Sequence, residues 1–441
     1  MRKSVLITII AFSVLLSLLV GGLRVFFPNG LSSESSSKES SRTPQTDAKS
    51  QENESSPYEA LNYETVKAVW ISQFDASQIY TENGAQRSKA DYTEKIKTVI
   101  KNLSFLGINT VFFQLRPNGD SIYPSKLFPT SKYVSGAYGK DTEYDAFQIF
   151  LEYAHQASIS VHAWINPLRC MKNSEISLIS NEYQIKKWYT EASPNIVTVD
   201  GYCYLNPAYD EVTELICGGV EEIMEKYDVD GIHIDDYFYP TTAESFDAEA
   251  YSEYKKSGGI LSLADFRRER INRLVREIYA AVKNSNPSVL FGVSPAGNVE
   301  RNYNELYADV AEWCSVGCYI DYICPQVYFG FEHQTHAFNE VCDTFSNMIK
   351  TDGIKLIIGM TLGKAYDACN GSVDVWAGAG EREWIENRDV LKRSLEYIKT
   401  IQNCEGAAFF SYRFFFDAST GAPVTETKDE IAAFLPILNG M

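Results

Sequence analysis

The strongest constraint on the fold is a regular alternation of short apolar runs and amphipathic stretches, which begins after residue 60. Eight of the runs are rich in β-branched and aromatic residues and have the length of buried strands. A stretch with helical periodicity follows each of them along the chain. The expected strands are Ala68–Phe74, Thr110–Leu115, Ser160–Ile165, Gly231–Asp235, Val289–Ser294, Tyr319–Cys324, Lys355–Thr361 and Ala407–Tyr412.

Two of the expected helices begin at capping boxes, Asp91-Tyr-Thr-Glu94 and Ser262-Leu-Ala-Asp265. The first should end near Leu106 and the second near Asn284. A loop of about forty residues follows the third strand. The other expected helices are Asp145–Ala157, Asp210–Tyr227, Tyr303–Val316, Phe338–Ile349, Trp384–Asn403 and Lys428–Leu438.

Eight strand–helix units in strict order are typical of one α/β fold, the (β/α)8 TIM barrel. The alternative is a doubly wound open sheet. However, Gln73-Phe-Asp-Ala-Ser follows the first strand, where a nucleotide-binding sheet would have a G-x-G-x-x-G loop. We therefore expect one barrel with long βα loops over residues 61–441.

A membrane segment is expected at residues 1–27. Arg2 and Lys3 precede an uncharged run of 19 residues, from Val5 to Leu23, which is close to the length that crosses a bilayer. We favour an uncleaved signal anchor, which would give a single-pass cell-membrane protein with the barrel outside the cytoplasm. A cleaved signal peptide would instead give a secreted protein.

The next segment and the overall composition narrow the class of protein. Residues 28–60 are dominated by Ser, Glu, Lys, Gln and Asn, so we expect a disordered linker. The net charge of −18 argues against nucleic acid as a partner. The nine cysteines leave at least one thiol unpaired, and most are expected to be small buried hydrophobes.

In a TIM barrel the functional residues lie where the strands end and the βα loops begin. Amides, guanidinium groups and aromatic rings gather at these positions, which suits a sugar with its hydroxyl groups and ring faces. The expected substrate-binding residues are Gln114, Arg116, Trp164, Asn166, Arg169, His233, Tyr237, Gln326, Tyr328 and Arg413.

Aromatic residues in two long loops are expected to form the walls of a groove. Trp188, Tyr189, Tyr202 and Tyr204 follow the third strand, and Trp376 follows the seventh. For any single one of them, packing against a helix is the alternative.

The end of the fourth strand carries the clearest chemical signal. Side chains alternate along a strand, so His233 and Asp235 share one face. That direction aims Asp235 into the barrel mouth as a catalytic carboxylate. The structural alternative is an ion pair with Arg116 or Arg169. Asp236 should point sideways, where it either contacts substrate or holds a neighbouring loop.

Glycoside hydrolysis requires a second carboxyl group. Glu332, in the loop after the sixth strand, is included with Asp235 and Asp236 as a catalytic candidate. Asp75 and Glu300 are further candidates. The sequence therefore indicates one carboxylate clearly and leaves the general acid open.

Other chemistries have weaker support, and we expect no cofactor and no metal. His333 and His336 are three residues apart, but no carboxylate spacing completes a zinc pattern. The sequence also lacks the Gly-x-Ser-x-Gly of a nucleophile elbow.

Several segments together resemble the glycosyl-hydrolase-like family 10, a bacterial envelope family. They are Ala68-Val-Trp-Ile, Asn109-Thr-Val-Phe-Phe-Gln-Leu-Arg-Pro, His162-Ala-Trp-Ile-Asn-Pro, Tyr227-Asp-Val-Asp-Gly-Ile-His-Ile-Asp-Asp-Tyr-Phe-Tyr-Pro and Asp321-Tyr-Ile-Cys-Pro-Gln-Val-Tyr. The resemblance covers nearly all of residues 63–420. It implies a barrel related to amylase-type glycosidases and a role in hydrolysing a glycan, such as that of the cell wall.

By this resemblance, His233-x-Asp235 is similar to the Arg-x-Asp of the amylase fourth strand, in which the Asp is the nucleophile. Two departures concern the rest of that mechanism. His stands in place of Arg, and Val293-Ser-Pro stands where a Glu would close the fifth strand. In chitinase-type barrels the acid would fall on Tyr237, so that mechanism does not carry over.

The expected function is that of an exported, membrane-tethered glycoside hydrolase acting on a bacterial envelope polysaccharide, first of all peptidoglycan glycan strands. Its partners would be the polysaccharide and, through the N-terminal helix, the cytoplasmic membrane. Two alternatives are a catalytically silent glycan-binding barrel and a polysaccharide-modifying metal enzyme.

Overall fold

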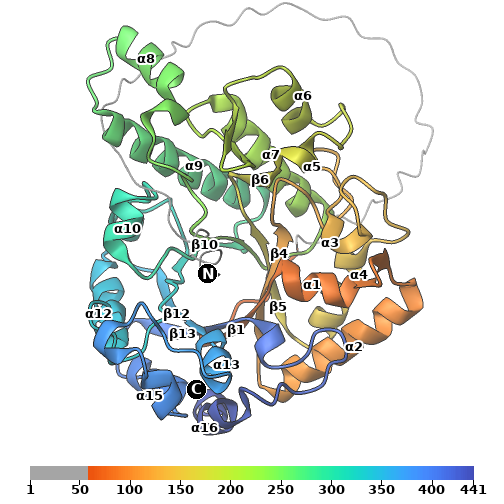
Figure 1. The fold of residues 1–441 in the computed structure, drawn as a ribbon, viewed down its shortest axis with the longest axis vertical. Coiled ribbons are helices and arrows are strands. Elements are labelled where there is room, and N and C mark those ends of the chain that lie inside the picture. The colour runs from red at the N-terminus through yellow and green to blue at the C-terminus, as the bar shows by residue number, and fades with distance from the viewer. Residues whose placement is uncertain (1–57) are drawn as a thin grey trace, which may run out of the picture.

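The computed structural model describes residues 58–441, and eight parallel strands close into a barrel at its centre (Figure 1). Their order around the barrel is β1-β13-β12-β11-β10-β9-β5-β4, so each strand lies beside its sequence neighbours. The (β/α)8 prediction is confirmed. The strands are β1 (Val66–Ile71), β4 (Thr110–Arg116), β5 (Ser160–Ile165), β9 (Gly231–Ile234), β10 (Leu290–Val293), β11 (Tyr322–Ile323), β12 (Lys355–Thr361) and β13 (Cys404–Phe410).

The helices surround the strands, and most lie where the sequence pattern places them. They are α1 (Gln73–Tyr80), α2 (Lys89–Phe105), α3 (Lys132–Ser135), α4 (Ala146–Gln156), α5 (Asn173–Ile176), α6 (Gln184–Thr190), α7 (Asp210–Lys226), α8 (Ala248–Lys256), α9 (Leu263–Ser285), α10 (Val299–Asn304), α11 (Val310–Ser315), α12 (Phe338–Met348), α13 (Gly363–Cys369), α14 (Glu383–Glu386), α15 (Val390–Ile398) and α16 (Lys428–Asn439). Two expected helices are each divided, into α10 with α11 and α14 with α15.

The two predicted capping boxes have different outcomes. Ser262 caps α9 by accepting a hydrogen bond from the backbone N–H of Asp265, as expected. The other prediction was wrong, because α2 begins one turn earlier and Ser88 is its N-cap. Ser88 accepts from the backbone N–H of Asp91, so Asp91 lies in the first turn, where its charge favours the helix dipole.

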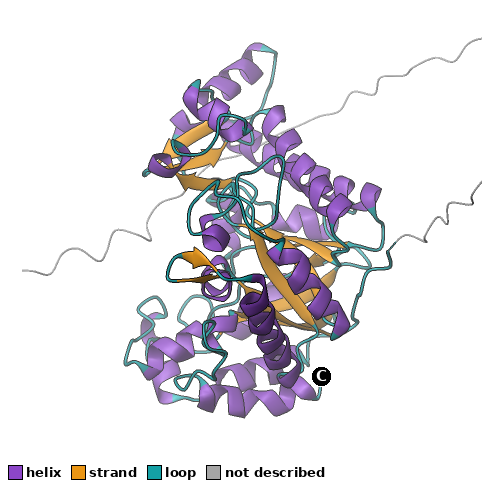
Figure 2. Ribbon diagram, turned by 90° about the vertical axis from the view of Figure 1, so that its right-hand side faces the viewer, coloured by secondary structure: helices purple, strands orange, loops and turns teal. Residues whose placement is uncertain are grey.

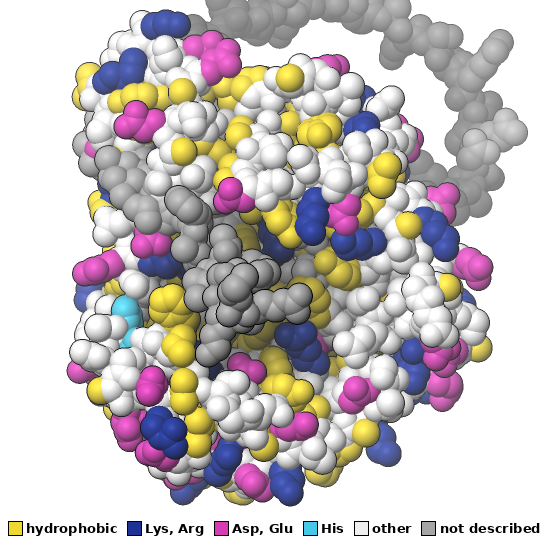
Figure 3. All heavy atoms as spheres, viewed as in Figure 1, with side chains coloured by type: hydrophobic (Ala, Val, Ile, Leu, Met, Phe, Trp, Pro, Cys, Tyr) yellow, Lys and Arg dark blue, Asp and Glu magenta, His cyan; other side chains and the backbone are white. Residues whose placement is uncertain are grey.

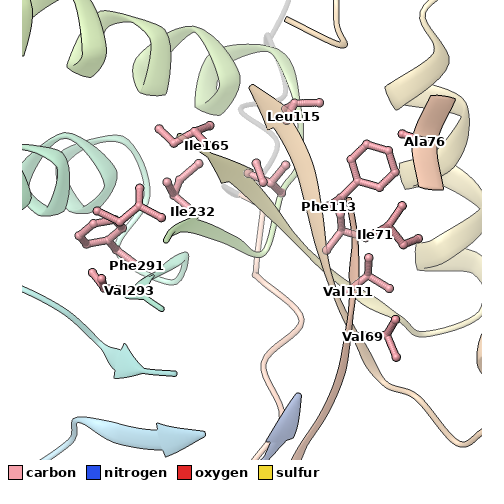
Figure 4. Packing of buried hydrophobic residues seen from close by; sticks show 14 of the residues in the cluster. Val69, Ile71, Ala76, Val111, Phe113, Leu115, Ile165, Ile232, Phe291 and Val293 are labelled. Carbon is pink, nitrogen blue, oxygen red and sulfur yellow. The ribbon is translucent and has the colours of Figure 1, made fainter. Parts of the chain in front are cut away.

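Two hydrophobic layers hold the barrel together. The outward-facing strand residues pack against the helices, among them Val69, Val111, Phe113, Ile232 and Phe291 (Figure 4). The inward-facing residues form a second cluster that includes Trp70, Phe112, Trp164, Tyr322 and Ala408. The barrel interior is therefore a packed core.

Glycines make room for the large rings inside the barrel. A Cβ atom at Gly231 would lie 2.3 Å from the His162 ring, and one at Gly292 would lie 2.1 Å from the Tyr322 ring. Since real Cβ atoms do not approach this closely, these two strand positions require glycine.

The long loop that was expected after β5 contains strands and helices and folds into a small unit. Strands β6 (Arg169–Lys172), β7 (Ile196–Val199) and β8 (Tyr202–Leu205) form an antiparallel sheet, with α5 and α6 in the connections. Figure 2 shows this sheet set apart from the barrel strands. A two-stranded hairpin, β2 (Thr81–Glu82) with β3 (Ala85–Gln86), follows α1.

The first described residues lie against the amino ends of the strands, opposite the mouth. The Tyr58 hydroxyl and the Leu61 backbone N–H donate to one oxygen of Asp230, at 2.7 and 2.6 Å. The Ala60 backbone N–H donates to Ser288 Oγ at 3.1 Å. Asp230 directly precedes β9 and Ser288 lies shortly before β10, so the chain approaches the barrel along its base.

The expected membrane segment, residues 1–27, and nearly all of the expected linker, residues 28–60, lie outside the described residues. Across residues 58–441, no helix is both long and apolar enough to cross a membrane. The nine cysteines are all free. Acidic and basic side chains are interspersed on the face seen in Figure 3, without a large patch of one sign.

Candidate active site

A cleft of about 520 Å³ lies at the carboxyl ends of the barrel strands. Most of the expected site residues meet there, although they come from four different barrel strands or the loops that follow them. The cleft lining includes Gln114, Trp164, Arg169, Asp235, Asp236, Tyr237, Gln326 and Tyr328. The tertiary structure thus brings together residues that are more than 200 positions apart in the chain.

Asp235 lies at the floor of the cleft and is only 4% exposed. Its Oδ2 accepts hydrogen bonds from Trp164 Nε1 at 3.1 Å and Asn166 Nδ2 at 2.6 Å, and its Oδ1 accepts from the Tyr237 backbone N–H at 3.2 Å. Burial, reinforced by the charge of Asp236, nevertheless raises the pKa of Asp235 to about 7. At neutral pH this carboxyl group is therefore divided between its acid and carboxylate forms.

A chain of hydrogen bonds fixes the orientation of Asp235. The Gln73 backbone N–H donates to Gln114 Oε1 at 2.7 Å, and Gln114 Nε2 donates to Asn166 Oδ1 at 2.7 Å. Asn166 then donates to Asp235. Each of the two side-chain amides accepts through its oxygen and donates through its nitrogen. This series of hydrogen bonds therefore runs in one direction and ends at Asp235, which is the final acceptor.

Asp236 has a more open and more polar environment than Asp235. Its Oδ1 accepts from Gln326 Nε2 at 3.0 Å, and its Oδ2 lies 3.4 Å from Arg301 Nη1. Gln326 also donates to the carbonyl of Ser294, which ties it to the end of β10. Asp236 therefore holds a neighbouring loop and also lines the cleft, and its contact with substrate stays a prediction.

Aromatic rings form the walls and the floor of the cleft. Trp70, Trp164, Tyr328 and Phe410 come from the barrel, and Tyr204 comes from the small sheet after β5. Tyr237 is 45% exposed on one wall, and the Arg169 guanidinium lies 4.6 Å from the centre of its ring. Such faces can stack on sugar rings, and nearby amides and arginines can bind hydroxyl groups.

His233 does not line the cleft, although its expected direction into the barrel is confirmed. It is fully buried and stacks on Phe112, with ring centroids 4.3 Å apart. Its Nε2 accepts from Trp70 Nε1 at 3.3 Å, so its own proton lies on Nδ1 and points to the Tyr322 hydroxyl at 2.9 Å. Burial lowers the pKa of His233 well below its ordinary value, so this neutral ring supports Trp70 from below and has no free surface for a substrate.

Arg116 also lies away from the cleft. The register of β4 against β5 shifts between Gln114 and Arg116, and this irregularity turns the arginine away from the mouth. Its guanidinium lies 3.9 Å from the Phe128 ring centre, and a Cβ at Gly219 of α7 would collide with it. Arg116 therefore packs between the barrel and α7, and contact with substrate is not available to it.

The other carboxyl candidates lie elsewhere. Glu332 and Glu300 are exposed and do not line the cleft. Asp75 is fully buried and accepts from the backbone N–H groups of Ser72 and Arg413, so it joins the start of α1 to the end of β13. Among residues 58–441, Asp235 and Asp236 are thus the only carboxyl groups lining the cleft.

The remaining expected residues have varied positions. Arg413 lies beside Phe74 near the rim, with its guanidinium 5.4 Å from that ring, but does not line the cleft. Of the loop aromatics, Trp188 is buried, whereas Trp376 is 69% exposed and borders a separate small pocket.

His333 Nδ1 accepts from the backbone N–H of His336, so this loop is held by its own hydrogen bonds. Across the described chain, no cluster of His, Cys, Asp and Glu has the arrangement of a metal site.

Sequence reasoning missed Arg301, Trp70 and Phe410, which all line the cleft. Arg301 lies in the first turn of α10, three residues after its N-cap Asn298. Arg301 could have been found from the sequence by including the first helical turn after the fifth strand among the candidate positions.

Comparison with known proteins agrees with this architecture. The family model described as Glycosyl hydrolase-like 10 matches residues 65–377. Glycosyl hydrolase YngK of Bacillus subtilis (strain 168) is 31% identical over 355 residues, which cover 76% of this chain and 66% of that protein. Glycosyl hydrolase DigH of Escherichia coli (strain K12) is 30% identical over 375 residues, covering 78% of this chain and 82% of that protein.

Solved structures share the fold at much lower sequence identity. The PgaB (BpsB) glycoside hydrolase domain from Bordetella bronchiseptica is 10% identical, with a TM-score of 0.51 over 84% of this chain and 99% of that one. The catalytic domain of β-amylase from Paenibacillus polymyxa is also 10% identical, with a TM-score of 0.50 over 84% of this chain and 98% of that one. The chain belongs to the Glycosyl hydrolase-like 10 family and is a glycosidase-type enzyme built on a TIM barrel.

Proposed function

We propose that the protein hydrolyses glycosidic bonds in a bacterial envelope polysaccharide, and first of all in peptidoglycan glycan strands. The main support is the pair of adjacent carboxyl groups, Asp235 and Asp236, in a cleft walled by aromatic rings. An aromatic cleft with convergent amides suits a chain of pyranose rings.

The two carboxyl groups have environments that suit different roles. Asp235, with its pKa raised to about 7, would donate a proton to the leaving oxygen as the general acid. Asp236, paired with Arg301, would supply the negative charge that stabilises a cationic transition state or activates the attacking group. This assignment exchanges the role that the amylase-like strand position suggested for Asp235.

We also propose that the protein acts outside the cytoplasm, tethered through residues 1–27. Residues 58–61 lie at the base of the barrel, opposite the cleft. A tether that continues from this end would leave the cleft facing away from the membrane and toward the wall.

The test is the release of reducing ends from purified sacculi by residues 58–441, with the Asp235→Asn variant as the control. Activity in the wild type and a loss of about 10³-fold in the variant would support the proposal. Binding to the glycan without any turnover would instead support a catalytically silent barrel. Loss of activity after exhaustive chelation would favour the metal-enzyme alternative.

A further inference from the structure

A second groove, of about 690 Å³, lies between the small sheet after β5 and the segment that leads into α8. Both walls belong to βα loops, the one after β5 and the one after β9, so the groove lies on the same side of the barrel as the cleft. In Figure 1, α6 and α8 mark the end of the molecule that carries these two loops.

Two separate stretches of chain run from the cleft wall into this groove. Tyr204 lines the cleft and Asn206, two residues later, lines the groove. Two residues of extended chain span roughly 7 Å. On the other wall, Tyr239 lines the cleft, while Phe246 and Asp247 line the groove. A linear glycan that leaves the cleft along these walls would meet the groove within a few sugar units.

Hydrogen bonds hold the two walls at a set separation. Asn206 Nδ2 donates to the carbonyl of Pro194 at 3.1 Å and to that of Phe246 at 3.3 Å, which joins one wall to the other. The Tyr239 hydroxyl donates to Asp247 Oδ2 at 3.1 Å, which joins the cleft wall to the groove wall. Hydrogen bonds between residues of the two linings therefore fix the shape of the groove and hold it beside the cleft.

The groove lining offers groups that bind sugar hydroxyls and ring faces. Tyr189 and Tyr209 are half-buried aromatic residues, and Thr190, Ser245 and Glu249 are exposed. Within residues 58–441, the side chains of Thr190, Ser245 and Glu249 form no hydrogen bond or ion pair with the protein, so they are available to a ligand. Almost all of its lining is uncharged, which suits neutral hexopyranose units.

We propose that this groove binds the continuation of the glycan chain that occupies the cleft, so that cleft and groove form one channel with several sugar subsites. The inference rests on the proposed glycosidase function and adds a preference for long, linear glycans over short ones. Binding in the groove would hold the scissile bond in the cleft more often when the chain is long enough to reach both.

The experiment uses the full-length protein and glycan strands that have been freed of peptides and separated by length. We expect kcat/KM to rise at least tenfold between the shortest strands cleaved and strands long enough to fill the groove. Ala248→Trp places a bulky ring in the groove without removing a native contact, and should lower this long-to-short ratio about tenfold. Glu249→Gln should lower it about threefold, whereas Glu244→Gln, a nearby exposed glutamate outside the groove, should leave it unchanged.

A binding measurement separates failure of the groove from failure of catalysis. The Asp235→Asn variant is titrated with the same strands in a calorimeter, with and without Ala248→Trp. Cleavage without any dependence on strand length would overturn the groove and leave the hydrolase function standing. Length-dependent binding that Ala248→Trp abolishes, without cleavage by the wild type, would support the groove and refute the hydrolase function. If neither cleavage nor length-dependent binding occurs, both proposals are wrong.

Discussion

The two ends of β9 carry buried aspartates with opposite properties. Asp230 precedes the strand at the base of the barrel, and Asp235 follows it at the mouth. Asp230 is fully buried and Asp235 is 4% exposed, yet the pKa of Asp230 is lowered and that of Asp235 is raised to about 7. Both carboxyl groups are buried, and the hydrogen-bond donors and charges around them differ.

At the base, many donors surround Asp230. Burial alone would raise its pKa, but hydrogen bonds from His155, Tyr58 and the backbone N–H groups of Val161 and Leu61 outweigh this effect. The His155 ring lies 2.9 Å from Oδ2. An aspartate with this many donors is stable as a carboxylate and serves to hold the N-terminal segment, β5 and β9 together.

At the mouth, Asp235 has fewer donors and a second acid next to it. Its three hydrogen bonds, from Trp164, Asn166 and Tyr237, do not offset burial and the neighbouring charge of Asp236. Ionisation of Asp235 is therefore unfavourable at the mouth of the barrel, where the proposed hydrolysis would need a proton donor. The comparison teaches that the two ends of one strand can carry buried carboxyl groups with opposite pKa shifts, which are distinguished by their partners.

The largest expected effect is on catalysis at the mouth. Asp235→Asn should lower kcat about 10³-fold, because an amide cannot donate the proton that the leaving group needs. Steady-state kinetics on the cleaved glycan provide the measurement. Full activity in this variant would show that Asp235 is not the acid. The two aspartates would then differ in pKa, without the catalytic role that is proposed for Asp235.

At the base, Asp230→Asn should lower the free energy of unfolding by about 3 kcal/mol, because it leaves several hydrogen-bond donors around a buried site without the carboxylate that accepts from them. Urea unfolding measures the change. The matched control is Asp228→Asn, an exposed aspartate two residues earlier, which should change stability little. Equal stability of the two variants would contradict the structural role of Asp230.

The two aspartates should also differ in how pH changes stability. The raised pKa of Asp235 means that the folded state loses stability as pH rises from about 4 to about 7, and Asp235→Asn removes that loss. The stability of this variant relative to wild type should therefore improve by about 2 kcal/mol between pH 5 and pH 8. The stabilising effect of Asp230, whose pKa is lowered, is present above pH 4 and disappears only as pH falls through its folded pKa. If the free energy of unfolding changed with pH in the same way in both variants, the opposite pKa shifts of the two aspartates would be wrong.

The last of these effects concerns the pH dependence of activity. If Asp235 is the acid, kcat/KM should fall about tenfold for each pH unit above about 7, as the essential proton is lost. Rates measured from pH 5 to pH 9 would show this decrease in kcat/KM at alkaline pH. A profile that stays flat up to pH 9 would indicate that Asp235 acts as a carboxylate, as its strand position first suggested.

Much of the fold could be predicted from local sequence, because strand and helix periods are local properties. The boundaries of β5 and β12 agree with the expected ones, and Ser262 was recognised as a cap. The start of α2 was placed one turn late, since Ser88 and Asp91 are both acceptable caps and local sequence does not choose between them.

The site was harder to predict, because side-chain direction at a strand end depends on register. Alternation placed Gln114 and Asp235 correctly at the mouth. The same reasoning was wrong for Arg116, since the irregularity after Gln114 turns the next side chains. Alternation along the strand also predicted that the His233 side chain points into the barrel. It did not predict that Trp70 and Phe112 would cover this ring.

By itself, the sequence determined the barrel, the fourth strand and the presence of two adjacent acids at its end. The strand count and the period of two suffice for that, since both follow from the backbone. Only the tertiary structure decided that the pKa of Asp235 is raised and which residues surround this carboxyl group. The pKa of Asp235 depends on burial, on donors from the loop after β5 and on the charge beside it, and Arg301 reaches Asp236 from a helix 65 positions away. Such distances between atoms are set by packing, which no local pattern encodes.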